Sequence, residues 1–61
     1  MKFVLYKDNQ KQYRWTLRAN NGRIIADSSE GYTSKQACQH GIDIMKRDVP
    51  KADVSDETEE Q

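Results

Sequence analysis

The sequence predicts an α+β fold: a three-stranded antiparallel meander, one helix packed on one face of the sheet and a short C-terminal strand (β-β-β-α-β). Two observations predict this order. Three short segments before residue 27 have strand-like patterns, and a longer segment after residue 34 repeats its apolar residues at helical spacing. A chain of 61 residues has room for one domain. We expect that domain over residues 1–56, followed by an acidic, disordered tail over residues 57–61.

The first two strands are predicted on either side of a polar turn. Residues 3–7 carry apolar side chains on both faces, and residues 8–11 are rich in turn-forming side chains. From residue 12 to residue 19 a period of two separates a core face from a cationic face. The core face holds Tyr13, Trp15 and Leu17, and the other face holds Arg14, Thr16 and Arg18.

A third strand is predicted over residues 23–26, where Ile24 and Ile25 are β-branched. The Asn-Asn-Gly sequence at residues 20–22 accepts positive φ angles, which favours a tight hairpin turn before this strand. The polar residues after it, 27–32, must cross from the sheet to the helix, and we expect Gly31 to take a positive φ there.

The helix is predicted to begin near Lys35, with Thr33 or Ser34 as its N-cap. With Thr33 as the cap, Gln36 would complete a capping box. The helix should end near Arg47 or Asp48, because Pro50 disfavours helical geometry at the residue before it. One apolar stripe suits it to lie on a sheet, formed by Cys38, Ile42, Met45 and Val49.

The last predicted strand, residues 52–56, has poor β-propensity, so the residues alone leave it undecided. Charge is unevenly distributed along the chain. All ten Lys and Arg residues lie within residues 2–51 beside five carboxylates, and the other five carboxylates lie in the last nine residues, which gives formal charges of +5 and −5. The acidic segment would compete with any polyanion for the basic body of the domain.

The composition excludes several ways of stabilising so short a chain. One cysteine cannot form an intrachain disulfide, and Cys38 with the single His40 falls short of a zinc set. The N-terminal apolar run, residues 3–6, is too short for a signal peptide or a membrane span, so we expect a cytoplasmic protein without a membrane partner. Because a small core is marginal by itself, oligomerisation is the remaining expectation.

Residues 6–42 resemble the YegP-like family, a group of small bacterial and archaeal proteins of unknown function. The residues that carry the resemblance are Tyr6-Lys7-Asp8, Tyr13-Arg14-Trp15, Asn21-Gly22, Ile24-Ile25-Ala26, Glu30-Gly31-Tyr32, Ser34-Lys35 and the helical segment from Cys38 to Ile42. The resemblance implies a β-β-β-α-β repeat, of which two build one continuous sheet and exchange their C-terminal strands. A chain with one repeat is then expected to form a strand-swapped homodimer. The family supplies no activity, cofactor or functional residue.

The crossing loop has a structural and a catalytic interpretation, and we favour the structural one. Its acid and hydroxyl side chains commonly satisfy loop backbone groups, and Tyr32 is expected to pack its ring on the sheet. An enzyme site would need Ser29, Glu30, Tyr32 and Lys35 to meet in a pocket. Lys35 with the first turn of the helix is the candidate receptor for an anion.

The sheet face away from the helix is predicted to carry Tyr6 between Arg14 and Arg18, with Val4, Thr16 and Ile24 or Ile25 beside them. An aromatic ring between guanidinium groups is the kind of surface that binds single-stranded nucleic acid, although a wet face of an antiparallel sheet is the simpler interpretation. Cys38 and His40 point about 200° apart on a helix, so they cannot form a catalytic dyad within one chain.

These inferences predict a homodimeric, non-enzymatic interaction module with no catalytic residues, metal site or cofactor. The alternatives are a weak nucleic-acid or anion binder and, less favoured, an enzyme that uses residues 28–35. The candidate ligand or partner surface consists of Tyr6, Arg14, Arg18, Glu30, Tyr32 and Lys35.

Overall fold

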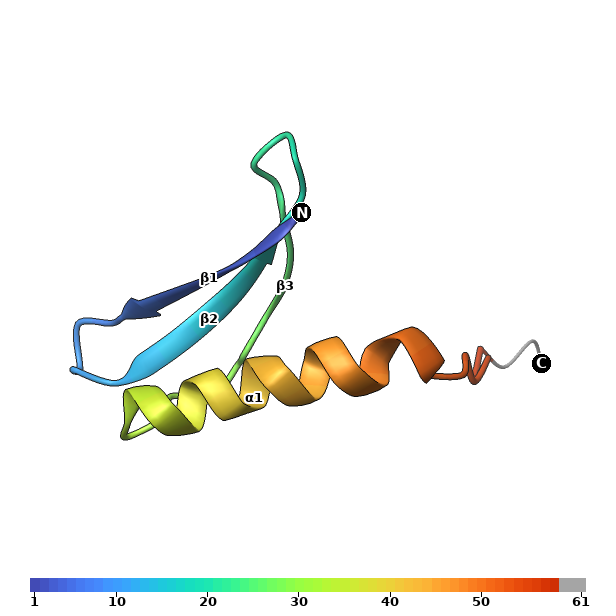
Figure 1. Ribbon diagram of the computed structural model, residues 1–61. Helices are drawn as coiled ribbons and strands as arrows, with labels where there is room; N and C mark the ends of the chain where they lie inside the picture. Colours follow the sequence, from blue (N-terminus) through green and yellow to red (C-terminus); the bar gives the residue numbers. More distant parts are fainter. Residues whose placement is uncertain (59–61) are drawn as a thin grey trace.

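Three antiparallel strands and one helix make up the computed structural model, which describes residues 1–58 (Figure 1). The strands are β1 (Lys2–Lys7), β2 (Tyr13–Arg18) and β3 (Ile24–Asp27), and they lie in the order β1-β2-β3, so both β1 and β3 are edge strands. The helix α1 (Lys35–Asp48) follows, and a 3-10 turn, η1 (Val49–Lys51), comes directly after it. The predicted meander and helix are thus confirmed.

The register of the sheet places the predicted core residues on one face. Phe3 of β1 is opposite Leu17 of β2, and Leu5 is opposite Trp15. The helix packs on this face, against β1 and β2. Trp15, Cys38 and Ile42 are buried there, and the ring of Phe3 meets the ring of Trp15 edge-on, with centroids 5.4 Å apart. A core this small is consistent with a domain of marginal stability.

The two hairpins close with the same turn geometry, although only one of them contains glycine. The backbone N–H of Lys11 donates to Asp8 O (3.0 Å), and the N–H of Gly22 donates to Ala19 O (2.9 Å). In each turn the donating residue has a positive φ, 64° at Lys11 and 88° at Gly22. This is the three-residue loop in which a turn is followed by a left-handed residue. The turn predicted at residues 20–22 is therefore confirmed.

The helix begins after Ser34, whose Oγ accepts a hydrogen bond from Ala37 N (3.1 Å). Ser34 is the N-cap, so the capping box that required Thr33 as the cap is not formed. The helix ends at Asp48 as predicted, but Val49 keeps helical dihedral angles (φ −59°, ψ −38°). Pro50 is accommodated because it lies in the first turn of η1, where a missing N–H costs little.

The predicted C-terminal strand does not form within the single chain. Residues 52–58 have no regular secondary structure, and in Figure 1 the chain continues beyond the helix and away from the sheet. Within residues 1–58 this segment pairs with neither edge strand of the sheet, β1 or β3. Residues 57 and 58 of the predicted acidic tail belong to this segment, and residues 59–61 lie outside the described residues. Within residues 1–58, no helix has the length and apolar character needed to cross a bilayer.

Candidate functional site

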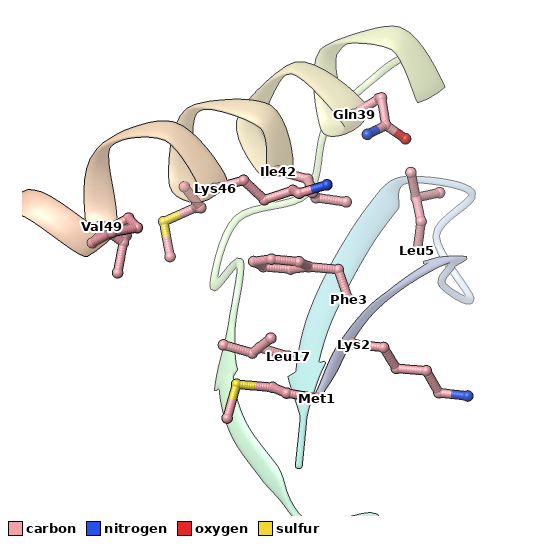
Figure 2. A pocket seen from close by; sticks show the side chains of 11 residues that line it. Met1, Lys2, Phe3, Leu5, Leu17, Gln39, Ile42, Lys46 and Val49 are labelled. Atoms are coloured by element: carbon pink, nitrogen blue, oxygen red, sulfur yellow. The ribbon is translucent and has the colours of Figure 1, made fainter. Parts of the chain in front are cut away.

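A groove of about 600 Å³ lies between the second half of α1 and the start of β1 (Figure 2). In Figure 2, Phe3 projects from β1 toward the helix, and Val49 marks the end of the groove where the helix and the sheet diverge. The apolar walls are formed by Phe3, Leu5, Leu17, Ile42, Met45 and Val49. Lys2 and Lys46 also line it. The groove lies beside β1, which is one of the two edge strands of the sheet and can therefore accept an added strand.

Sequence reasoning did not predict this groove. The signal that was present is the length of the apolar stripe on the helix, which continues through Met45 to Val49, beyond the last buried residue, Ile42. Val49 is 50% exposed, and Val54, farther along the chain, is 94% exposed. Exposed apolar residues at the end of an otherwise packed stripe are typical of an interaction surface.

Arg14, one of the predicted contact residues, is engaged within the protein. Its Nε donates to Asp8 Oδ2 (2.6 Å), and its Nη1 donates to Ser29 O (3.3 Å). This hydrogen bond from Arg14 lowers the pKa of Asp8, and the backbone N–H of Gln12, which donates to Asp8 Oδ1 at 2.9 Å, lowers that pKa further. Arg14 therefore joins the β1–β2 turn to the loop after β3, and these contacts hold its guanidinium in place.

The polar atoms of the loop after β3 are largely used by its own backbone. Asp27 Oδ1 accepts from Ser29 N (2.9 Å), and Ser28 Oγ donates to Glu30 O (3.0 Å). Ser28 Oγ also accepts from Trp15 N (3.3 Å), so the loop is tied to β2. These contacts support the structural interpretation of the acid and hydroxyl side chains in this segment.

Gly31 does not take the positive φ expected of it; Ser29 does so instead, with φ 56°. Gly31 is required for a different reason. A Cβ at this position would lie 2.9 Å from the Cβ of Gln12, closer than side chains tolerate. The glycine therefore lets the loop pass directly over the start of the second strand.

Tyr32 lies on the helix side of the sheet, as expected from its aromatic ring. Its backbone exchanges hydrogen bonds with Tyr13, both at 2.8 Å, as an isolated bridge. Its hydroxyl lies against Gly41 of the helix, 2.7 Å from the position that a Cβ would occupy there. The indole Nε1 of Trp15 is 3.7 Å from the same position and is buried without a hydrogen-bond partner among the described residues. Tyr32 thus belongs to the packing between the loop and the helix.

The open face of the sheet carries Tyr6 and Arg18 as predicted. Tyr6 is 41% exposed and lies opposite Arg14. Arg18 lies directly opposite Lys2, so two cations share neighbouring positions on this face. Ile24 and Ile25 on β3 are each 56% exposed. The face therefore combines exposed apolar groups with positive charge.

The remaining candidate residues do not converge on one pocket. Glu30 is exposed in the loop, and Lys35 is exposed as the first residue of α1. Cys38 is fully buried, which raises the pKa of its thiol, whereas His40 is exposed. Among residues 1–58, no group of His, Cys, Asp and Glu side chains is arranged to hold a metal ion. The predicted surface therefore divides into an open sheet face and a loop that is packed against the helix.

Comparison with known proteins identifies a family for most of the chain. Residues 8–56 match the family described as a domain of unknown function, DUF1508. The chain is also similar to a protein from Haloferax volcanii whose structure was solved by NMR in solution. The two share 47% sequence identity with a TM-score of 0.82, over 90% of this chain and 92% of that one. The similarity supports the α+β fold.

Two bacterial relatives differ in length. A UPF0339 protein of Neisseria meningitidis serogroup B is 56% identical over 46 residues, which cover 75% of this chain and 80% of the relative. A UPF0339 protein of Stutzerimonas stutzeri is 40% identical over 48 residues, 79% of this chain but only 42% of that relative. The second relative is thus more than twice as long as the segment that matches.

Proposed function

Because the chain belongs to the DUF1508 family, the YegP-like group that its sequence resembles, we propose that it is a homodimeric, non-enzymatic interaction module of the cytoplasm. The observation that carries the homodimer is the groove of about 600 Å³ beside the free edge of β1. An exposed apolar groove on so small a domain is unfavourable in water, and a second copy can cover it without any other component.

The segment that fills the groove in this proposal is the C-terminal segment of the second copy. Residues 52–56 pair with β1, so that the two sheets become continuous and each domain completes the predicted β-β-β-α-β order. Val54 is the apolar residue of this segment, and at 94% exposure it has no partner in the single chain. Pairing satisfies the backbone groups of both edges at once. The Stutzerimonas stutzeri relative is long enough to hold two such units in one chain, which supports this arrangement.

The absence of an enzymatic activity is supported by the loop after β3. Asp27 and Ser28 bond to neighbouring backbone groups, whereas Ser29, Glu30 and Lys35 are exposed and do not line the groove beside β1. A catalytic acid or nucleophile needs free atoms that face a substrate. In the proposed dimer the protein acts through its surfaces, chiefly the open face of the extended sheet.

Sedimentation equilibrium of the full chain tests the homodimer. We expect a mass twice that of the 7.1 kDa chain at micromolar concentration. A truncated chain of residues 1–51 should sediment as a monomer or unfold, because it lacks the segment that completes the sheet. A full-length chain that stays folded and monomeric at millimolar concentration would overturn the proposal.

Nucleic-acid binding is the second candidate function, favoured by the exposed ring of Tyr6 near the Lys2–Arg18 pair. Arg14 contributes less than the sequence suggested, since Asp8 holds its side chain. Fluorescence anisotropy with a labelled single-stranded oligonucleotide tests it. Binding should weaken steeply as salt is added and strengthen when residues 53–61 are deleted. No change in anisotropy at low salt, with or without those residues, would remove this candidate.

A further inference from the structure

Lys2 and Arg18 lie directly opposite each other on the open face of the sheet. Like charges at directly opposed positions of an antiparallel pair destabilise the sheet. The chain offers little compensation, because the only carboxylate between Lys2 and Asp27 is Asp8. Asp8 lies at the far end of the β1–β2 hairpin and is bonded to Arg14. Asp27 ends β3 on the same face but lies opposite Thr16, and its Oδ1 accepts from Ser29 N, so no carboxylate of the sheet stands directly opposite Lys2 or Arg18.

The acidic C-terminal segment of the same chain does not approach this pair. Asp53 comes two residues after η1, where the chain leads away from the sheet (Figure 1). Within residues 1–58, no ion pair involves Asp53, Asp56 or Glu57: Glu57 Oε2 accepts from Ser55 Oγ at 3.0 Å, and Asp56 Oδ1 accepts from Thr58. In the single chain, the Lys2–Arg18 pair thus has no anion directly opposite it, and the described carboxylates of the acidic segment pair with no cation.

Strand geometry decides which carboxylates would reach the pair if the segment of a second copy adds to the edge of β1. Side chains alternate between the two faces of a strand. With Val54 directed into the apolar groove on the helix face, Asp53 and Glu57 emerge on the opposite face. Lys2 and Arg18 alternate with Phe3 and Leu17, which face the helix, so their side chains belong to that opposite face. Figure 2 shows the side chain of Lys2 directed away from the helix, although Lys2 borders the groove.

We propose that Lys2 and Arg18 form the receptor for the carboxylates of Asp53 and Glu57 of a second copy. This inference rests on the proposed homodimer. It adds the charged contacts by which the edge of β1 would bind the acidic segment in preference to an uncharged strand. The receptor makes association dependent on salt, since ion pairs at an exposed sheet edge are screened. It also explains how a segment with poor β-propensity is held on the sheet.

Charge reversal at both sides of the contact tests the inference. We expect the variant Asp53→Lys with Glu57→Lys to dimerise about tenfold more weakly than the unaltered chain at low salt, and the variant Lys2→Glu with Arg18→Glu to do the same. An equimolar mixture of the two variants should form heterodimers about as tightly as the unaltered chain forms homodimers. High salt should reduce all of these differences.

Matched controls separate this contact from a general effect of net charge. Asp43→Lys and Lys11→Glu alter exposed positions on α1 and in the β1–β2 turn, and neither should change the dimer dissociation constant by more than about twofold. Circular dichroism establishes that each variant is folded. Variants that dimerise as tightly as the unaltered chain, or a mixture that restores nothing, would overturn the receptor while leaving the homodimer intact. An unaltered chain that is monomeric throughout would overturn both proposals.

Discussion

The Nε of Arg14 lies 2.6 Å from the Oδ2 of Asp8, and this contact fastens the β1–β2 turn to the strand that leaves it. The same guanidinium reaches the backbone oxygen of Ser29, so three segments meet at one side chain. The alternating pattern assigned Arg14 to an open binding face, but the side chain of Arg14 connects segments of the fold.

Replacing Asp8 should make the protein less stable at neutral pH but not in strong acid. The hydrogen bond from Arg14 lowers the pKa of Asp8 in the folded protein. The ionised carboxylate therefore stabilises the fold above the unfolded pKa, about 4, and this stabilisation is lost as the pH falls through the lowered folded value. The free energy of unfolding of Asp8→Asn, measured with urea by Trp15 fluorescence, should be lower than that of the unaltered chain near pH 7 and similar near pH 2.

Asp43→Asn is the control for this measurement, because it removes an exposed carboxylate whose one side-chain hydrogen bond within residues 1–58 comes from Gln39. We expect little effect of that change at either pH. If Asp8→Asn lowered the stability equally at both pH values, the ionised state of Asp8 would not be the cause.

Substituting glycine for Lys11 should stabilise the protein. Lys11 occupies the left-handed position of its turn with φ 64°, which costs a residue with a Cβ about 1 kcal/mol. Glycine adopts this geometry freely but loses more entropy on folding, so we expect a net gain of about 0.5 kcal/mol in the free energy of unfolding.

Gly22→Ala provides the reverse experiment in the second turn. No atom lies within 4 Å of the added Cβ, so any loss of stability reports the φ of 88° alone. We expect a loss of about 1 kcal/mol. Lys11→Gly should raise the free energy of unfolding and Gly22→Ala should lower it. Changes of the same sign would contradict the shared turn geometry.

Gly41→Ala should destabilise the protein, although alanine is the better helix former by about 1 kcal/mol. The added Cβ would lie 2.7 Å from the hydroxyl of Tyr32, and that ring is fixed by its backbone contacts with Tyr13. In a chain that already carries Tyr32→Phe, the same substitution should be tolerated better by about 1–2 kcal/mol, because the hydroxyl is gone. Urea unfolding of the unaltered chain, the two single variants and the double variant measures this coupling. If the two substitutions changed the free energy of unfolding additively, the proposed contact would be contradicted.

Val54→Asp should weaken the proposed homodimer. Burying a valine side chain contributes about 1.5–3 kcal/mol, so the dissociation constant should rise by at least about tenfold. Ser55→Asp adds the same charge at the neighbouring position, where alternation directs the side chain away from the groove. Sedimentation equilibrium of both variants makes the comparison, and equal weakening by the two would contradict the placement of Val54.

Local patterns were sufficient for most of the fold. The alternation from Tyr13 to Arg18 defined both faces of β2, because a strand has a period of two whatever surrounds it. Turn chemistry located the hairpin at Gly22, and the cap at Ser34 was one of the two residues expected. The left-handed residue of the crossing loop was misplaced at Gly31, since the close approach of Gln12, rather than a φ angle, requires that glycine.

The candidate surface was less predictable, because its character depends on contacts between segments far apart in the chain. The pattern placed Arg14 and Tyr6 on the same face correctly, yet it could not show that Asp8 holds Arg14. Tyr32 has a role in packing that rests on a glycine nine residues later, Gly41. The groove combines Phe3 of β1 with Val49 at the end of the helix, and no local pattern brings those two residues together.

By itself, the sequence determined the three strands and the helix, their order and the two faces of β2, because these follow from the periodicity and turn chemistry of neighbouring residues. Only the tertiary structure decided which charges are free and where apolar surface remains uncovered. It bonded Arg14 to Asp8, placed Lys2 directly opposite Arg18 and opened a groove beside β1. The physical reason is that the divergence of α1 from the sheet and the register of β1 on β2 arise from packing across the whole chain.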